Sequence, residues 1–539
     1  MDLTIIALAT AATVIRALLL ILVAIITGWI LAYIAIKSRT FENVYVPLVN
    51  VFESIPVIGF LPIVLIVFIT GVGGVLGVEL AADFLVFDAV AWNVWIGVYQ
   101  AFKTVPENLL EVSENYRFGA LGTLKDLYIP HSIPRITSNM FSSFADAFFY
   151  ISVSEVFTVG IKTYQTFGIG TLIAQFIREG SLVNVYYSLF FIAIGVVAIT
   201  FAFARLSRWA VAKFGVDTAY EIKRHTGWLR TSLYHSYHAV SSEVGSLARW
   251  ASRATSRNRD LDQEESARTR RKLFKYIGFS LLAALLAFLL YSFYRLALSV
   301  SVQQWATYLS ETPFLLYSMG VDYLRVAVVT LVSTALAITF GYFLAVHRRL
   351  SLTIAPAFQA FAAFPAPAYF PLVFIFTLPF VENAVPFLYT EVYIFILGFL
   401  SCFYYVFFDF WIAVQAIPIE FWDVMRNHEV GFMARMRRII IPAAFPYLVT
   451  GLSSTINSAW AGIAIGEYWP NIYGSHSLVA SVGMMKFIGF NLARGDIGAA
   501  AWVSLIFAIV VFIYGLVFTR RLMDVARKRY VVEEGVYAA

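Results

Sequence analysis

The sequence contains little charge and almost no cysteine. Only 13% of its 539 residues are Asp, Glu, Lys or Arg, whereas soluble domains contain roughly 25%. The hydrophobic share is 60% and the mean hydropathy is +0.77. This composition excludes an ordinary soluble fold and predicts a polytopic membrane protein. Because Cys402 is the single cysteine, the chain cannot form an internal disulfide bond. This cysteine lies inside an apolar run.

Signatures of catalysis and of ligand binding are also lacking. The sequence has no G-x-x-x-x-G-K-[ST] motif, which would hold the phosphates of ATP. The glycine cluster at 71–77 is not followed by the lysine of such a motif, and we place it in an outer turn. His235 and His238 have a spacing that suits a metal, but no carboxylate or cysteine completes a site. We therefore expect no catalysis, metal or cofactor in this chain, and no nucleic-acid partner.

Long apolar runs cover most of the chain. A helix needs about 20 apolar residues to cross the hydrocarbon core, and backbone groups in lipid must be bonded within the segment. We expect eleven transmembrane helices, near 13–36, 48–70, 84–103, 136–160, 183–206, 272–298, 323–346, 356–379, 389–414, 444–468 and 498–519. The amino terminus has no basic segment, which favours a retained first span over a cleaved signal peptide.

An internal duplication relates the two ends of the chain. The polar stretches 106–130 and 418–442 each lie between apolar runs, and an offset of 312 residues superimposes them. This offset matches Pro106 with Pro418, Gly119 with Gly431, Pro130 with Pro442 and Glu155 with Glu467. In the earlier spans the offset is 309, which matches Pro56 with Pro365 and Pro62 with Pro371. Five spans thus pair with five, and the span near 272–298 has no counterpart.

The unpaired span determines the topology. Five spans per half would invert the second half, and one further crossing restores the orientation of the first. With the amino terminus outside, the inner segments contain 31 Lys and Arg residues and the outer segments contain four. Because Lys and Arg are enriched in cytoplasmic loops, both polar repeats are expected to face the cytoplasm, as does the carboxyl terminus. The predicted fold is all-α, with two parallel five-helix repeats plus one extra helix.

The domain boundaries follow from the same pattern. We expect a first half at 1–207, a basic cytoplasmic linker at 208–271, the extra helix at 272–298 and a second half at 299–539. Within the linker, apolar residues recur every three or four positions from Leu229 to Leu247. Two interpretations stay open for this stripe. It is either a helix lying in the anionic inner interface of the membrane or a spacer that packs on its neighbours.

The duplicated polar stretches have the pattern of docking segments. Each contains a short amphipathic helix with an early acidic residue, then a glycine, an apolar segment and a proline where the next span begins. Such a helix is too polar to enter lipid and too short to be stable alone in water, so it is expected to dock into a partner. The key residues are Glu111, Gly119 and Pro130 in the first copy, and Asp423, Gly431 and Pro442 in the second.

These residues resemble the cytoplasmic "EAA" loop of the inner-membrane permeases of binding-protein-dependent ABC importers. That loop begins with an acidic residue and two alanines, has a glycine about nine residues later and ends in a hydrophobic-Pro pair. Val112-Ser113 and Val424-Met425 replace the two alanines here. The resemblance covers both halves but not the linker or the extra helix. Gly168-Ile169-Gly170 and the stretch from Ser458 to Glu467 are similar to the nitrate, sulfonate, taurine and bicarbonate branch.

The resemblance implies the partners and the cofactors. The six key residues would couple the chain to ABC ATPase subunits in the cytosol. Because two permease halves are fused, one chain would recruit two ATPase subunits, and ATP and Mg²⁺ would bind to those subunits and not to this chain. The chain would lie in the cell membrane, and an extracytoplasmic solute-binding protein would deliver solute to the outer mouth of its pathway. The branch suggests a small anion or organic acid, although the outer segments offer only Lys162, Arg178, Lys486 and Arg494 to bind one.

Intramembrane carboxylates are the candidates for the translocation pathway, because charges in lipid are costly and usually face the bundle interior. Glu155 and Glu467 are expected near the outer ends of their spans, either at an outer gate or as interfacial charges that reach water. Asp146 lies deeper and its repeat partner is Ser458, so any central site is asymmetric. We include Trp460 from the branch-like stretch. Asp146 has an alternative role, which is to pair with a neighbouring helix.

Three functional classes remain at this point. The favoured class is a fused permease of an ABC importer, without catalysis of its own. The alternative is a secondary transporter that is driven by an ion gradient through the intramembrane carboxylates. The third class, a membrane scaffold, would require that no cavity lie between the halves.

Overall fold

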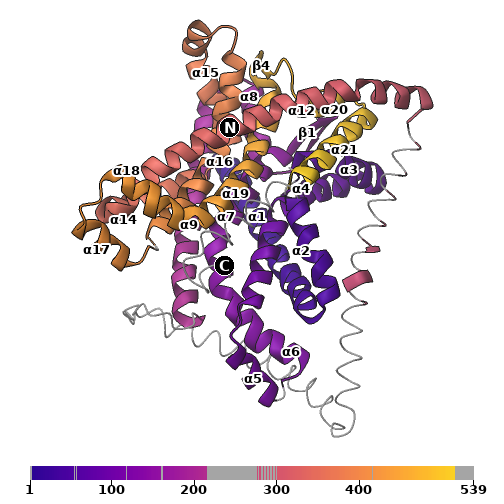
Figure 1. Cartoon of the computed structure of the whole chain (residues 1–539). Helices are drawn as coiled ribbons and strands as arrows, with labels where there is room; N and C mark the ends of the chain where they lie inside the picture. Colours follow the sequence, from indigo (N-terminus) through magenta and orange to yellow (C-terminus); the bar gives the residue numbers. More distant parts are fainter. Residues whose placement is uncertain are drawn as a thin grey trace.

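The computed structural model describes residues 3–515, apart from 54, 56, 117, 160–161, 215–275, 416 and several positions between 277 and 299. The described part consists almost entirely of α-helices, which cross one another in one bundle (Figure 1). Its only strands are two short hairpins. This confirms the predicted all-α class of a polytopic membrane protein.

The first half begins with a long helix and ends with another. Its elements are α1 (Leu3–Lys37), α2 (Arg39–Glu53), η1 (Val57–Phe60), α3 (Leu61–Val64), η2 (Leu65–Val72), α4 (Gly74–Lys103), α5 (Glu107–Asn115), α6 (Ala120–Thr123), η3 (Leu124–Tyr128), α7 (Ile129–Ser154), β1 (Val156–Val159), β2 (Lys162–Gln165), α8 (Ile169–Arg178) and α9 (Leu182–Phe214). The segments η2 and η3 are π-helical.

The second half follows the same order of elements. They are α12 (Val302–Leu336), η4 (Ala337–Gly341), α13 (Tyr342–Val346), α14 (Arg348–Ala362), α15 (Ala366–Ala384), α16 (Tyr389–Gln415), α17 (Ile419–Asn427), α18 (Phe432–Arg435), η5 (Met436–Ile440), α19 (Ile441–Glu467), β3 (Tyr468–Tyr473), β4 (His476–Val479), α20 (Met484–Ala493) and α21 (Ile497–Tyr514). The bounds of α2 and α14 differ by 309 residues at both ends, and those of α5 and α17 differ by 312. After the hairpins, α8 and α20 differ by 315.

The second predicted span of each half is not one straight helix. Between α14 and α15 the chain bends by 92°, and α2 likewise ends at Glu53 before helical structure resumes at Val57. Pro365 precedes α15 in an extended conformation. A residue before proline is driven away from helical geometry, which explains the break after Ala362. The predicted spans near 48–70 and 356–379 are therefore each interrupted by a break.

The predicted count of eleven spans is not confirmed. Among the described residues, six helices are long and apolar enough to cross a membrane, or seven if the bent pair is one span. The helix α4 is not among them, and it contains Glu79, Asp83 and Asp88. Most of the predicted extra helix at 272–298 and of the linker lies outside the described residues. The helix α9 continues to Phe214, beyond the boundary predicted at 207.

The two halves interlock through their broken second spans. One apolar core is formed mainly by α1, α4, α7 and α9, and it includes Leu372 of α15. A second core is formed mainly by α12, α19, α20 and α21, and it includes Leu65 of η2. Each half therefore contributes a broken span to the core of the other. This arrangement brings α4 and α7 close to α16 and α19 at the centre of the molecule.

Candidate functional site

The two duplicated polar stretches fold in the same way. In each, a nine-residue helix (α5 or α17) is followed by a glycine that precedes a four-residue helix, by a π-helical turn and by the next long helix. Gly119 and Gly431 are the residues before the short helices, and Pro130 and Pro442 lie in the first turn of α7 and α19. We call 107–128 and 419–440 the coupling segments.

The outer surface of each coupling segment is exposed and partly apolar. Glu111 and Asp423 are exposed to solvent. A Cβ atom added to Gly119 or Gly431 would meet nothing within 4 Å. Large apolar side chains at matching positions are open to solvent: Val112 (48%) and Val424 (51%), Leu121 (79%) and Met433 (73%). Both segments lie at the edge of the molecule, α5 and α6 at the bottom and α17 at the left of Figure 1, away from the hairpins.

Polar and aromatic contacts fix the coupling segments on the bundle. The hydroxyl of Tyr33 donates a hydrogen bond of 2.9 Å to the carbonyl of Ala120. At the same repeat position, the ring of Tyr342 contacts the ring of Phe432 with centroids 5.6 Å apart. Tyr33 of α1 in the first half and Tyr342 of α13 in the second half thus contact the short helix that follows the glycine.

Glu155, at the carboxyl end of α7, lies in a buried polar cluster and is 0% exposed. Its Oε1 accepts a hydrogen bond of 2.6 Å from the hydroxyl of Thr13, and its Oε2 accepts one of 2.6 Å from the backbone N–H of Gly170. The guanidinium of Arg16 lies 3.5 Å from Oε1 and also pairs with Glu79 at 2.5 Å. This first cluster connects α1, α4, α7 and the amino terminus of α8.

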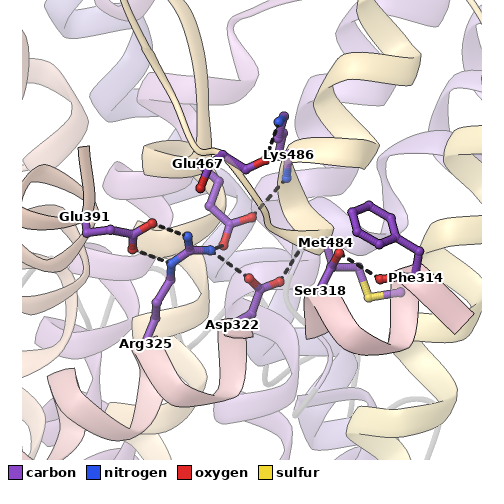
Figure 2. Close-up of polar contacts among 9 residues, drawn as sticks. Phe314, Ser318, Asp322, Arg325, Glu391, Glu467, Met484 and Lys486 are labelled. Atoms are coloured by element: carbon purple, nitrogen blue, oxygen red, sulfur yellow. Dashed lines mark hydrogen bonds and ion pairs between the residues drawn. The ribbon is translucent and has the colours of Figure 1, made fainter. Parts of the chain in front are cut away.

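Glu467 occupies the equivalent position in a second cluster (Figure 2) and is also 0% exposed. The guanidinium of Arg325 donates to Glu467 at 2.8 Å, to Asp322 at 2.9 Å and to Glu391 at 2.5 and 2.7 Å. The backbone N–H groups of Met484 and Lys486, in the first turn of α20, donate to Asp322 and Glu467.

These clusters have a clear physical role. The first backbone N–H groups of a helix have no partner within it, and the amino terminus carries partial positive charge. A buried carboxylate at the end of α7 or α19 satisfies those groups in α8 or α20. The structure therefore places Glu155 and Glu467 inside packed polar clusters.

Trp460 is 1% exposed and packs against the rings of Tyr323 and Phe507, with centroids 5.1 and 5.0 Å away.

A cavity of about 80 Å³ lies between the two halves. That is several times the roughly 10–15 Å³ that one water molecule requires. Asp146 and Ser458, the predicted central pair, both line it, and the hydroxyl of Tyr405 donates a hydrogen bond to Asp146. The other residues lining the cavity are Glu53, Ile55, Val57, Asp88, Ala89, Trp92, Asn93, Phe149, Tyr150, Ser401, Tyr404, Tyr405, Ser454, Asn457 and Ala461.

The sequence analysis missed two carboxylates of this cavity. Asp88 lies within the predicted span 84–103, so the rule that intramembrane charges face the interior applied to it as much as to Asp146. Glu53 ends α2 at the break, and no sequence signal predicted that the break faces the centre. Among the cavity-lining residues there is no Lys or Arg.

Comparison with known families gives one result that covers most of the chain. The family described as "Binding-protein-dependent transport system inner membrane component" matches residues 4–216 and 337–531. Comparison with curated proteins gives no match. The first matched segment covers the first structural repeat, and the second covers the second repeat from η4 onward, without α12. The chain therefore belongs to the family of inner-membrane components of binding-protein-dependent transport systems, and it carries two copies of the family's fold.

Proposed function

We propose that this chain forms the solute pathway of an ATP-driven importer and that each coupling segment receives one cytosolic ATPase subunit. The family is one of transporter membrane components, which work with ATPase and solute-binding partners. In the proposal both coupling segments face the cytoplasm, the amino terminus lies outside and a solute-binding protein docks at the outer face. ATP and Mg²⁺ bind to the ATPase subunits.

The observation that carries the proposal is the pairing of the coupling segments. Their helices have the same lengths and spacing, and both present exposed apolar residues at the same positions. Exposed apolar patches in a polar segment are typical of interaction sites. Open space around Gly119 and Gly431 would let a partner approach the backbone closely. Glu111 and Asp423 would contact that partner, and Pro130 and Pro442 would transmit its movement into α7 and α19.

The test is to make both glycines bulky. Gly119→Trp and Gly431→Trp should leave the thermal stability of the chain unchanged, because a Cβ atom at either position has no neighbour within 4 Å and both glycines have a negative φ that other residues adopt. Each variant should weaken the co-purification of the ATPase at least tenfold, and the double variant should abolish it together with ATP-dependent uptake. The control is Ser475→Trp, which adds the same bulk to an exposed turn between β3 and β4.

The alternative function is a secondary transporter driven through Asp146 and its neighbours. In that case uptake would persist in the double glycine variant and would follow an imposed ion gradient without ATP. Normal ATPase association in that variant would refute the coupling role of these residues. The resemblance to the nitrate and sulfonate branch stays a prediction about the class of solute.

A further inference from the structure

The carboxylates of the central cavity all come from one half of the chain. Glu53 is on α2, Asp88 on α4 and Asp146 on α7. Their repeat positions in the second half are occupied by Ala362, Leu400 and Ser458. Within the described residues, no ion pair joins Glu53, Asp88 or Asp146 to a Lys, Arg or His. The cavity thus combines three carboxylates with no protein cation.

One of these carboxylates is incompletely bonded. Asp88 is 3% exposed, and its Oδ1 accepts a hydrogen bond of 3.0 Å from the indole of Trp92. Its Oδ2 is buried and has no hydrogen-bond partner among the residues that the structure describes. A buried carboxylate oxygen without a hydrogen-bond partner is costly and requires an explanation, and a bound ligand that donates to it would supply one.

The remaining walls favour an organic cation over a metal ion. The rings of Trp92, Tyr150 and Tyr404 line the cavity beside the carboxylates, and aromatic rings attract ammonium and guanidinium groups through their faces. A metal ion requires several ligands at close range. No group of three or more His, Cys, Asp and Glu side chains in the described part of the chain is arranged to hold one.

We propose that the central cavity binds a small organic cation, with an ammonium or guanidinium group, and that the transported solute belongs to this class. The inference rests on the proposed function, because it assigns the solute of the same pathway. Asp88 and Glu53 would pair with the positive group, and hydroxyls of the second half, such as Ser458, would bond the polar remainder of the solute. An anion, as in the nitrate and sulfonate branch, would meet three carboxylates and no cation.

The experiment measures charge selectivity inside the cavity. In the full-length Cys402→Ala chain in nanodiscs, Ser458→Cys provides one thiol in the cavity and Ser475→Cys provides one on the exposed turn. Each is treated with 2-aminoethyl or 2-sulfonatoethyl methanethiosulfonate. The thiolate attacks the reagent's sulfenyl sulfur, a mixed disulfide forms and methanesulfinate leaves. The carboxylates also change the ionised fraction of the thiol, but this change affects both reagents equally and cancels in the ratio of the two rates.

The cation-to-anion rate ratio at Ser458→Cys should exceed that at Ser475→Cys at least tenfold. Asp88→Asn should reduce it severalfold, as should Glu53→Gln, which alters a half-buried residue and so tests the same point if the first variant folds poorly. The matched control is Asp409→Asn, which removes a carboxylate of α16 that does not line the cavity and should leave the ratio unchanged.

Equal ratios at the two thiols would overturn the proposal, since they would indicate a neutral solute. A preference for the sulfonate reagent would overturn it in favour of an anion. Failure of both reagents at Ser458→Cys, with normal reaction at Ser475→Cys, would also overturn it, because the cavity would not communicate with water. ATPase association is measured on the same preparations, so a failure of the importer assignment is distinguished from a failure of the solute class.

Discussion

Arg16 and Arg325 occupy the same position in the two halves, and so do Glu155 and Glu467, but their surroundings differ. Thr13 in the first cluster corresponds to Asp322 in the second. Each accepts a hydrogen bond from the first residue of a short helix, at 2.9 Å from Ile169 and at 2.7 Å from Met484. The geometry is thus repeated, and the second cluster achieves it with one more buried carboxylate.

The central cavity differs from these clusters because its carboxylates are not repeated. Its three carboxylates lie in the first half and have uncharged counterparts in the second. The comparison separates two kinds of polar residue within one duplicated chain. Residues that fix short helices recur with their contacts, whereas residues that face the cavity differ between the halves. An asymmetric solute can be bound by such a cavity in one orientation, which a symmetric cavity would not specify.

The largest expected effect comes from removing the cation of the second cluster. Arg325→Ala leaves Asp322 and Glu467, both 0% exposed, without a counter-charge. Breaking a buried ion pair in this way typically costs about 3–5 kcal/mol. Arg16→Ala should cost less, about 1–3 kcal/mol, because Glu155 keeps its bonds to Thr13 and Gly170. Thermal unfolding of the purified chain in nanodiscs, followed by tryptophan fluorescence, compares the two variants.

A second substitution tests the cause of that difference. Asp322→Thr places the residue type of the first cluster in the second and removes one buried carboxylate. Combined with Arg325→Ala, it should recover part of the lost stability. Equal losses for the two arginine variants, or no recovery in the double variant, would show that the extra carboxylate does not distinguish the clusters.

Two glycines allow a change that should affect both halves equally. A Cβ atom on Gly168 would overlap the carboxylate of Glu155, and one on Gly483 would overlap that of Glu467. Gly168→Ala and Gly483→Ala should each displace the carboxylate from its helix terminus, at a cost of about 1–3 kcal/mol in the same unfolding assay. Gly320→Ala is the control, because its Cβ would meet nothing within 4 Å. A loss in only one half would contradict the equivalence of the clusters.

The repeat was the part of this structure that the sequence predicted best. Polar residues flanked by apolar runs cannot lie in lipid, so the coupling segments were recognisable and their offset of 312 reproduces the helix bounds. The offset of 315 after the hairpins was missed, because β3 and β4 lengthen the second half where few charges mark the register. The prolines at 56 and 365 match each other in the repeat, but the break in the span at Pro365 was not predicted.

The clusters were harder to predict than the coupling segments. Arg16 and Arg325 are repeat partners, but apart from Asp322, which is three residues from Arg325, the carboxylates that they contact are 63 to 142 residues away in the sequence. Glu155 and Glu467 lie at the carboxyl ends of their helices, and the prediction that these are the outer ends, like a role at an outer gate, stays a prediction. The cavity depends on how the halves interlock, and hydrophobic periodicity contains no information about that contact.

A smaller comparison concerns the contact of α2 with α4 in the first half and of α14 with α16 in the second half. Glu42 of α2 pairs with the ammonium of Lys103 at 2.7 Å and accepts a hydrogen bond of 2.5 Å from Tyr99. At the same repeat positions, Gln415 donates a hydrogen bond of 3.4 Å to Ser351. Both halves therefore join the same two helices, one with an ion pair and the other with uncharged groups.

This contact gives the smallest predicted effect and a dependence on pH. Burial raises the pKa of Glu42, but hydrogen bonds from Lys103 and Tyr99 outweigh it and hold the pKa below its ordinary value of 4.5. The stability from ionised Glu42 is thus present above about pH 4.5 and is lost as the pH falls through the folded-state pKa. Since Lys103 is 48% exposed, Lys103→Ala should cost only about 0.2–1 kcal/mol at pH 7 and nothing at the lowest pH. The loss of stability caused by Gln415→Ala should not depend on pH. If the losses caused by both variants became smaller together as the pH is lowered, the difference between the two contacts would be refuted.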